Sequence, residues 1–229
     1  MTSATTKAKP TATRKPRIKS KRAKTRDVAT NKNVRDPRAY QIARLDRSTL
    51  TQAPDETLRD TFIGLPEDVR ERSVSDLNQL LVDTMMLRDL YKKSHWQLSG
   101  ATFFQLHTLF DRHYREQDEL VDLMAERVQL LGGVSIAMPE AVSERTRIPQ
   151  PPVGREDPSV QITRLLDAHA TILDFARDAA KTAGESRDVR TEDVIVGRLI
   201  ATNEKQSWFV AEHSVPTQLQ GGVRLDKAS

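Results

Sequence analysis

The chain has 229 residues, of which 37% are hydrophobic and 30% are charged, and it carries a formal net charge of +4 and no cysteine. This composition supports one buried core of about 140 residues with polar appendages, rather than a core along the whole length. It excludes disulfides, thiolate metal ligands and cysteine nucleophiles, and no apolar run approaches the roughly 18 residues that a membrane-spanning helix requires.

Residues 1–26 form a basic tail. They contain ten Lys or Arg residues and no acidic residue, which leaves 26 basic and 32 acidic residues over positions 27–229. With almost no large apolar side chains, the tail cannot offset the entropy that ordering would cost, so we expect it to be disordered. The ten candidate DNA-binding residues are Lys7, Lys9, Arg14, Lys15, Arg17, Lys19, Lys21, Arg22, Lys24 and Arg26.

A tail of this kind favours sequence-independent binding to DNA phosphates through counterion release. It has no aromatic residues between its charges, which disfavours a protein specific for single-stranded bases. The alternative is a solubilising or targeting tail without a partner. The N-terminus also lacks the apolar segment of a secretory signal, so we expect a cytoplasmic protein without a membrane partner. Binding of the tail to DNA would associate it with the nucleoid.

Residues 27–65 are a polar N-terminal extension, interrupted by Pro37, Pro54 and Gly64. A short helix is predicted near residues 54–62. The extension contains no histidine, which excludes a histidine-based metal site within it.

The first long helix is predicted to end near Trp96. Pro66 opens a helical stretch with acidic residues in its first turn, and Ser73 or Ser75 is a candidate cap for the main helix. The predicted core positions are Leu77, Leu80, Leu81, Leu87 and Leu90.

The second helix is predicted from Phe103 to Leu131, because this segment has no Pro or Gly and Gly132 follows it. Its apolar stripe consists of Leu106, Leu109, Phe110, Leu120, Val121, Met124, Val128 and Leu131. At about 100° per residue, a set of potential metal ligands lies about 130° from this stripe and therefore faces away from the chain's own core. This set is His107, Asp111, Asp122 and Glu126.

These ligands form two pairs that cannot meet within one chain. His107 and Asp111 are four residues apart and can converge on one ion, as can the second pair, Asp122 and Glu126. Eleven residues, or about 16 Å of helix, separate the pairs, whereas metal–ligand distances are about 2 Å. If a second copy crosses antiparallel with a two-fold axis near residues 116–117, opposite pairs face each other and two identical sites form.

His95 precedes His107 by twelve residues, across the break at Gly100, and could fold back as a further nitrogen ligand. Any one of these five residues, taken alone, is more often an ordinary surface or hydrogen-bonded side chain. The prediction of a metal site therefore depends on the ligands lying together on one helix face. Mixed imidazole and carboxylate ligands suit iron, manganese or zinc better than calcium, and iron is favoured.

The remaining elements complete the predicted bundle. Prolines between Ser135 and Pro158 indicate a long crossover with room for a short helix. A third helix is predicted from about Ser159 to Ala183, with Gly184 as its stop and Ile162, Leu165, Leu166, Ile172, Leu173 and Ala176 as its core positions.

A fourth helix is predicted from about Thr191 to His213, before Pro216. The long crossover between helices two and three predicts an all-α, ferritin-like four-helix bundle over residues 66–215, followed by a C-terminal tail over 216–229.

Other classes are disfavoured. A di-iron site within one bundle uses Glu-x-x-His motifs, and none occurs in this chain. Nothing resembles the nucleophile elbow of a Ser-His-Asp hydrolase. His113, His169 and His213 are expected to be surface or satisfied histidines without a role.

The pattern HWxLxGxxFxxLHxxFD over residues 95–111, followed by DxxxE at 122–126, resembles the ferroxidase signature of Dps proteins, the dodecameric mini-ferritins. The resemblance implies that His95, His107 and Asp111 come from one subunit, and Asp122 and Glu126 from its two-fold mate. It also places Trp96 beside the iron site, although a core position is an equally good reading of that residue.

The resemblance further implies a ferroxidase. It would oxidise Fe²⁺ to Fe³⁺, preferably with hydrogen peroxide, store the ferric mineral in a twelve-subunit shell, and bind and protect DNA through the basic tail. Asp111 and Glu126 would be the principal anionic ligands. The alternative is a structural nucleoid protein whose metal site is vestigial or structural.

Overall fold

The computed structural model describes residues 58–214, and these residues form a bundle of helices without β-strands. The basic tail 1–26, most of the 27–65 extension and the whole 216–229 tail lie outside the described residues. The helical elements are α1 (Glu67–Gln97), α2 (Phe103–Leu130), α3 (Pro139–Arg145), α4 (Pro158–Glu185), α5 (Val189–Val194), η2 (Ile195–Ile200) and α6 (Ala201–Ala211).

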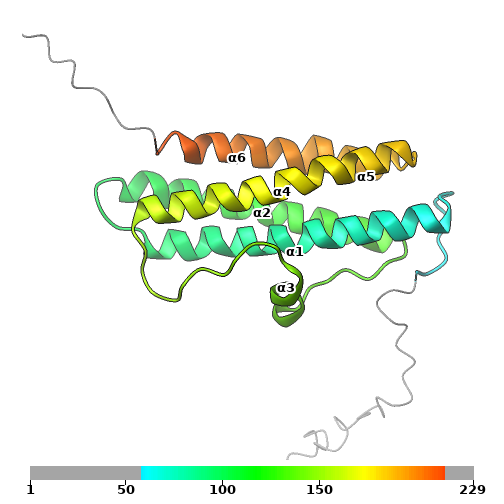
Figure 1. The fold of residues 1–229 in the computed structure, drawn as a ribbon, viewed down its shortest axis with the longest axis horizontal. Helices are drawn as coiled ribbons and strands as arrows, with labels where there is room; N and C mark the ends of the chain where they lie inside the picture. Colours follow the sequence, from blue (N-terminus) through cyan, green and yellow to red (C-terminus); the bar gives the residue numbers. More distant parts are fainter. Residues whose placement is uncertain (1–57, 215–229) are drawn as a thin grey trace, which may run out of the picture. The chain divides into compact units, whose positions relative to one another are not determined.

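The four long helical segments are α1, α2, α4 and the continuous run α5–η2–α6 (Figure 1). Helix α1 packs along α2 and α4, while α6 packs along α4. None of the helices within residues 58–214 is long and apolar enough to cross a lipid bilayer. The predicted all-α, ferritin-like bundle is thereby confirmed.

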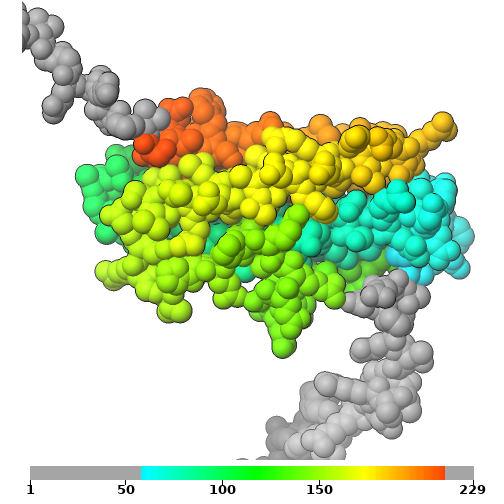
Figure 2. Space-filling view, in the orientation of Figure 1, coloured from blue at the N-terminus to red at the C-terminus, as the bar shows by residue number. Residues whose placement is uncertain are grey.

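A long crossover joins α2 to α4. The amide of Asn78, near the start of α1, donates to the carbonyl of Val134 at 3.0 Å, and Gln97, at the end of α1, donates to Val153 at 3.5 Å. The crossover therefore returns along α1, so that α2 and α4 start at the same end of the bundle. Figure 2 shows the crossover and α3 lying over α1 on this face.

The predicted apolar stripes form the core. All eight stripe residues of α2 are buried except Leu109, which is half-buried and packs against the core. The five predicted core leucines of α1 and five of the six core residues of α4 are also buried, with Leu166 packed at the edge.

The start of the first helix differs from the prediction. Helix α1 begins directly after Pro66, with Glu67 and Asp68 in its first turn, where the helix dipole favours acidic residues. Ser73 lies inside the helix, where its hydroxyl donates to a carboxylate oxygen of Asp188 at 2.8 Å. Neither Ser73 nor Ser75 is therefore a cap, and the prediction of a separate main helix was wrong.

The helix predicted at residues 54–62 was wrong over its described part. Residues 58–62 are not helical, and residues 54–57 lie outside the described residues. The N–H of Arg59 donates to the carbonyl of Gly132 at 2.8 Å, and the guanidinium of Arg70 donates to the Arg59 carbonyl at 2.9 Å. These longer-range partners hold the segment against the end of α2 in place of helical hydrogen bonds.

Gly184 does not stop the third helix. Helix α4 continues to Glu185, and the chain turns at Arg187, whose φ is 62°. A Cβ atom on Gly184 would lie 2.9 Å from a carboxylate oxygen of Glu192. The glycine thus permits the close approach of the following helix, and Asp188 caps that helix by accepting from the Thr191 N–H at 3.1 Å.

The last helix contains a π-helical turn that its 3.6-residue periodicity did not predict. Residues 195–200 form η2, between α5 and α6. A π turn adds one residue and shifts the phase of everything that follows it. As a result, Asn203 and Gln206 of α6 face the interior, where both are fully buried.

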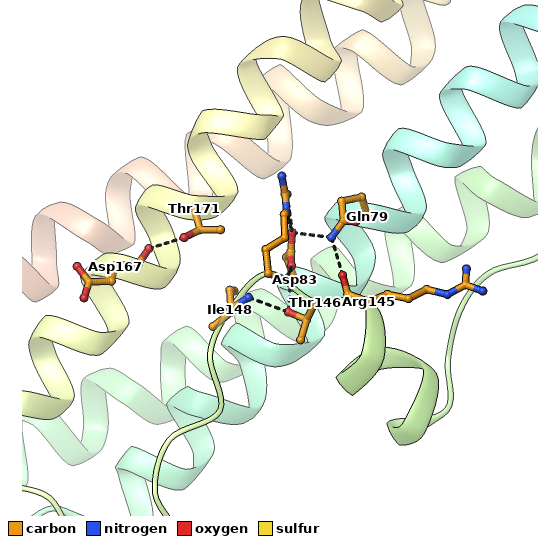
Figure 3. A network of polar contacts seen from close by, with 8 residues as sticks. Gln79, Asp83, Arg145, Thr146, Ile148, Asp167 and Thr171 are labelled. Atoms are coloured by element: carbon orange, nitrogen blue, oxygen red, sulfur yellow. Dashed lines mark hydrogen bonds and ion pairs between the residues drawn. The ribbon is translucent and has the colours of Figure 1, made fainter.

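An ion pair fastens the crossover to α1. Asp83 is fully buried and accepts from the Arg147 guanidinium at 2.6 and 3.0 Å, the Arg147 N–H at 2.8 Å and the Thr146 hydroxyl at 3.0 Å. Figure 3 shows Gln79 and Asp83 of α1 facing Thr146, with Gln79 donating to the Arg145 carbonyl at 3.1 Å. These contacts position α3 and the crossover against the helix that carries His95.

Candidate metal centre

His95 and His107 lie side by side at the turn between α1 and α2. Gly100, with a φ of 95°, allows the chain to reverse there. The two imidazole rings stack with their centroids 3.6 Å apart and their planes 20° apart. The structure thus brings together the two histidines that the sequence placed twelve residues apart.

Reciprocal hydrogen bonds determine the tautomers of both rings. His95 Nδ1 lies 2.8 Å from the carbonyl of His107, and His107 Nδ1 lies 3.0 Å from the carbonyl of His95. A carbonyl only accepts, so each Nδ1 carries a proton and Nε2 is the nitrogen that each ring can offer to a metal ion. A backbone carbonyl on the second ring nitrogen is the usual support of a metal-binding histidine.

Asp111 is half-buried and is held by two cations. One carboxylate oxygen lies 2.8 Å from Lys92 Nζ and the other lies 2.6 Å from the Arg115 guanidinium. The Lys92 hydrogen bond, with the charges of Lys92, Arg115 and His95, holds the pKa of Asp111 below its usual value. The carboxylate is therefore ionised and lies close to the histidines, and an arriving metal ion would compete with both cations.

Asp122 and Glu126 lie on the same helix and are exposed. They are eleven or more residues beyond Asp111, or about 16 Å along α2, so the structure does not bring them to the histidines of their own chain. Within residues 58–214, no group of three or more His, Asp or Glu side chains could hold a metal ion in a single copy. One chain therefore supplies at most part of the predicted site.

Exposed aromatic side chains surround the histidine pair. Trp96 is 71% exposed and Phe104 is 74% exposed, while Phe103 stacks on His107 with ring centroids 4.9 Å apart. Trp96 is therefore not a core residue of its own chain, which excludes its interpretation as a core aromatic. Large exposed aromatics gathered in one region are typical of a surface that another protein covers.

A second cluster of polar side chains, which the sequence analysis did not predict, lies in the bundle core. His113 and His169 are fully buried and both contact the hydroxyl of Tyr91. His113 and Gln117 fall on the helical phase of the apolar stripe of α2, and this was the signal that could have placed them inside. The partners on α6 had no such signal, because the π turn sets their phase.

Comparisons with known proteins agree with this architecture. A sequence profile of the ferritin-like domain family matches residues 74–218. An uncharacterized protein from the bpoA2 5′ region of Kitasatospora aureofaciens is 50% identical over 132 residues, which cover 58% of this chain and 83% of that protein. A DNA protection during starvation protein of Agrobacterium fabrum is 27% identical over 149 residues, covering 65% of this chain and 91% of that one.

Among solved structures, DpsC from Streptomyces coelicolor is similar to this chain with a TM-score of 0.72 and 47% sequence identity. The match covers 74% of this chain and 98% of DpsC.

Proposed function

The chain belongs to the ferritin-like domain family and, within it, to the Dps proteins, and from this premise we propose that it is a ferroxidase that stores iron and binds DNA. The observation that carries the proposal is the stacked pair His95 and His107. Their Nδ1 atoms donate to backbone carbonyls, so Nε2 is the nitrogen that each ring can offer to a metal ion beside the ionised Asp111.

The donor set fits Fe²⁺ as the substrate. Two imidazole nitrogens and carboxylate oxygens suit a borderline divalent ion such as iron better than a hard ion such as calcium. The exposure of Asp122 and Glu126 leaves both free to serve a second copy of the chain. Each complete site would then contain His95, His107 and Asp111 of one subunit, and Asp122 and Glu126 of another.

The reaction consumes two Fe²⁺ ions and one hydrogen peroxide. Two electrons pass from iron to peroxide, whose O–O bond breaks, and two protons complete two water molecules. Asp111 and Glu126 would stabilise the additional positive charge of Fe³⁺. The carbonyls that accept from the two Nδ1 atoms would keep His95 and His107 oriented with Nε2 toward the ion.

We assign storage and assembly to a shell of twelve subunits, as in the family. The exposed Trp96, Phe103 and Phe104 support burial of this end of the bundle against a second copy. Ferric product would be retained as mineral inside the shell. The ten basic residues of the 1–26 tail would hold the shell on DNA without sequence preference, which would place the protein on the nucleoid in the cytoplasm.

One observation favours a second candidate function. Lys92 and Arg115 form ion pairs with the two oxygens of Asp111. This is the arrangement expected if ion pairs have replaced metal binding at the site. The alternative is therefore a structural nucleoid protein with a vestigial or structural metal site.

Turnover distinguishes the two functions. The assembly is loaded anaerobically with two Fe²⁺ per site, peroxide is added, and ferric absorbance is followed. The proposal expects rapid oxidation that consumes one peroxide per two Fe²⁺. The structural alternative expects the slow background rate of free Fe²⁺, together with unchanged DNA binding.

A further inference from the structure

A cluster of polar side chains occupies the centre of the bundle, apart from the candidate metal centre. Its members are contributed by α1, α2, α4 and α6 and are fully buried. Few polar groups lie in such a position unless they are fully hydrogen-bonded or functional. The buried cluster consists of Tyr91, His113, Gln117, His169, Asn203 and Gln206.

The direction of the hydrogen bonds in the buried cluster follows from Asn203. Its amide nitrogen donates to the carbonyl of Leu199, in the π turn, at 2.8 Å. Its oxygen therefore accepts from His169 Nδ1 at 2.8 Å and from the Gln117 amide at 3.2 Å. Because His169 carries its proton on Nδ1, its Nε2 is the acceptor for the Tyr91 hydroxyl, 2.5 Å away.

His113 completes the surroundings of the Tyr91 oxygen. Tyr91 has a single hydroxyl proton, which points to His169, so His113 Nδ1 donates to the same oxygen at 3.1 Å. His113 Nε2 is then the unprotonated nitrogen, and it is buried without a partner among the described residues. The phenol thus donates to one imidazole and accepts from another.

Tyr91 and His169 favour their neutral forms, because burial lowers the pKa of His169 to about 4 and raises the pKa of Tyr91 well above its usual value. A neutral phenol loses an electron readily only if its proton leaves at the same time, since the oxidised phenol is a strong acid. The lone pair of His169 Nε2 is placed to accept that proton.

Tyr91 is also close to the candidate metal centre. It directly precedes Lys92, which pairs with Asp111, and it lies one helical turn before His95. Its ring contacts Phe110, the residue before Asp111, with centroids 5.6 Å apart. Electrons can therefore pass between the centre and Tyr91 through adjoining side chains and a short stretch of backbone.

We propose that Tyr91 is a redox-active residue that supplies one electron when peroxide meets a site holding a single Fe²⁺. The inference rests on the proposed ferroxidase function and deepens it. One Fe²⁺ delivers only one of the two electrons that peroxide needs, and one-electron reduction would release a hydroxyl radical. Tyr91 provides the second electron and so completes the reduction to water.

The step balances in atoms and charge. Peroxide, one Fe²⁺, the Tyr91 phenol with neutral His169, and two protons give one Fe³⁺, two waters, a neutral Tyr91 phenoxyl radical and protonated His169. The O–O bond breaks, and the phenolic proton moves to His169 Nε2. A later Fe²⁺ returns the electron, and His169 gives back the proton, which restores the phenol.

Rapid-freeze electron paramagnetic resonance tests this role. The assembly receives one Fe²⁺ per site anaerobically, then peroxide, and is frozen within the lifetime of the reaction. We expect an organic radical whose hyperfine splitting collapses when the protein contains ring-deuterated tyrosine. An organic radical that tyrosine deuteration leaves unchanged, such as one on the exposed Trp96, overturns the proposal, as does the absence of any organic radical.

Variants locate the radical. Tyr91→Phe should abolish the tyrosine signal, whereas the control Tyr114→Phe, a half-buried tyrosine of α2, should retain it. His169→Gln keeps Tyr91 but removes the proton acceptor, so the radical yield should fall at least several-fold. A tyrosine signal that survives Tyr91→Phe contradicts the assignment. If Tyr91→Phe does not fold, loss of the tyrosine signal from Tyr114→Phe would still contradict the assignment.

Iron stoichiometry separates this inference from the function on which it rests. With two Fe²⁺ per site, Tyr91→Phe should oxidise iron at the parental rate, because iron then supplies both electrons. If the parent protein oxidises iron but forms no tyrosine radical, only the role of Tyr91 is wrong. If the parent does not oxidise iron, the proposed function is wrong, and the role of Tyr91 with it.

Discussion

In metalloproteins, groups that do not bind the metal themselves hold its ligands in the right orientation. The carbonyls of His95 and His107 would do this in the candidate centre. Each holds the neighbouring imidazole in one tautomer and one orientation, at 2.8 and 3.0 Å. Because backbone carbonyls hold the two rings, no further side chain is needed to orient them. Substitution of the carboxylate ligands therefore tests the metal site directly.

Replacing Asp111 with Asn and Glu126 with Gln should leave the assembly intact, because neither side chain belongs to the core. Peroxide-dependent iron oxidation should slow by roughly a hundredfold or more, since changes in outer-shell partners alone cost 10–100-fold. Stopped-flow ferric absorbance and size-exclusion chromatography measure the two effects. Glu119→Gln, an exposed carboxylate on the same helix, is the control, and parental activity in the double variant would refute the site.

The buried imidazoles make the protein sensitive to acid. His113 and His169 have pKa values of about 3 and about 4 in the folded chain, against about 6.5 when unfolded. The unfolded chain binds these protons first, so stability is complete above about pH 6.5 and declines as the pH falls toward the folded values. At pH 5, each should reduce the free energy of unfolding by about 2 kcal/mol.

Urea unfolding at pH 7, 6 and 5 measures this loss. His169→Gln should show a shallower dependence on pH, because one of the two titrating imidazoles is gone. His213→Gln, which removes an exposed histidine, should follow the parent chain. A His169→Gln profile parallel to that of the parent would contradict the assignment.

A buried carboxylate, Asp83, helps to hold the crossover to α1. Asp83 is fully buried, whereas its partner Arg147 has a side chain that is 36% exposed and lies over the Phe175 ring at 4.2 Å. The two members of the pair are therefore not equivalent. Without its partner, the arginine can reach water, but the aspartate cannot.

Arg147→Met should thus be more destabilising than Asp83→Asn. The first leaves a buried negative charge without its cation and should cost about 3 kcal/mol or more of unfolding free energy. The second leaves a charge that solvent can reach and should cost less. Chemical denaturation orders the variants, with Arg155→Met as an exposed control on the crossover. If Asp83→Asn were the more destabilising variant, the unpaired buried charge of Asp83 would not be the larger cost.

At the scale of the whole molecule, the proposed centre requires two chains. A His107→Ala chain and a Glu126→Ala chain should each be inactive alone, because every site lacks a ligand. When the two are refolded together, a mixed interface contains one site with all its ligands and one that lacks two. Iron oxidation should therefore recover in part, and verified mixed dimers without any recovery would argue against a shared site.

The basic tail carries the charges proposed to bind DNA. Deleting residues 1–26 removes ten positive charges and leaves an acidic remainder, so DNA binding should be lost while iron oxidation continues. The intact protein should lose about three decades of affinity for duplex DNA between 50 and 200 mM salt if six phosphates are neutralised. Co-sedimentation of full-length and truncated assemblies at both salt concentrations measures this. Equal binding by the truncated form would assign DNA contact to another segment.

Most of the fold follows from local sequence patterns. Local periodicity placed the apolar stripe of α2 and the core residues of α4, because burial follows the helical repeat. The same repeat directed His107, Asp111, Asp122 and Glu126 away from the core. Their eleven-residue separation alone showed that one chain cannot close the site. That the ligands of a second copy complete it stays a prediction.

Contacts between distant segments could not be predicted from local periodicity. Local sequence could not show that Ser73 is no cap, because its partner Asp188 lies 115 residues away, nor that Gly184 is no helix stop, because Glu192 packs against it from the next helix. The carbonyl partners of the histidine pair appear only once α1 and α2 have folded together. The π turn shifts the phase of α6, so no periodicity could place Asn203 beside His169 in the core.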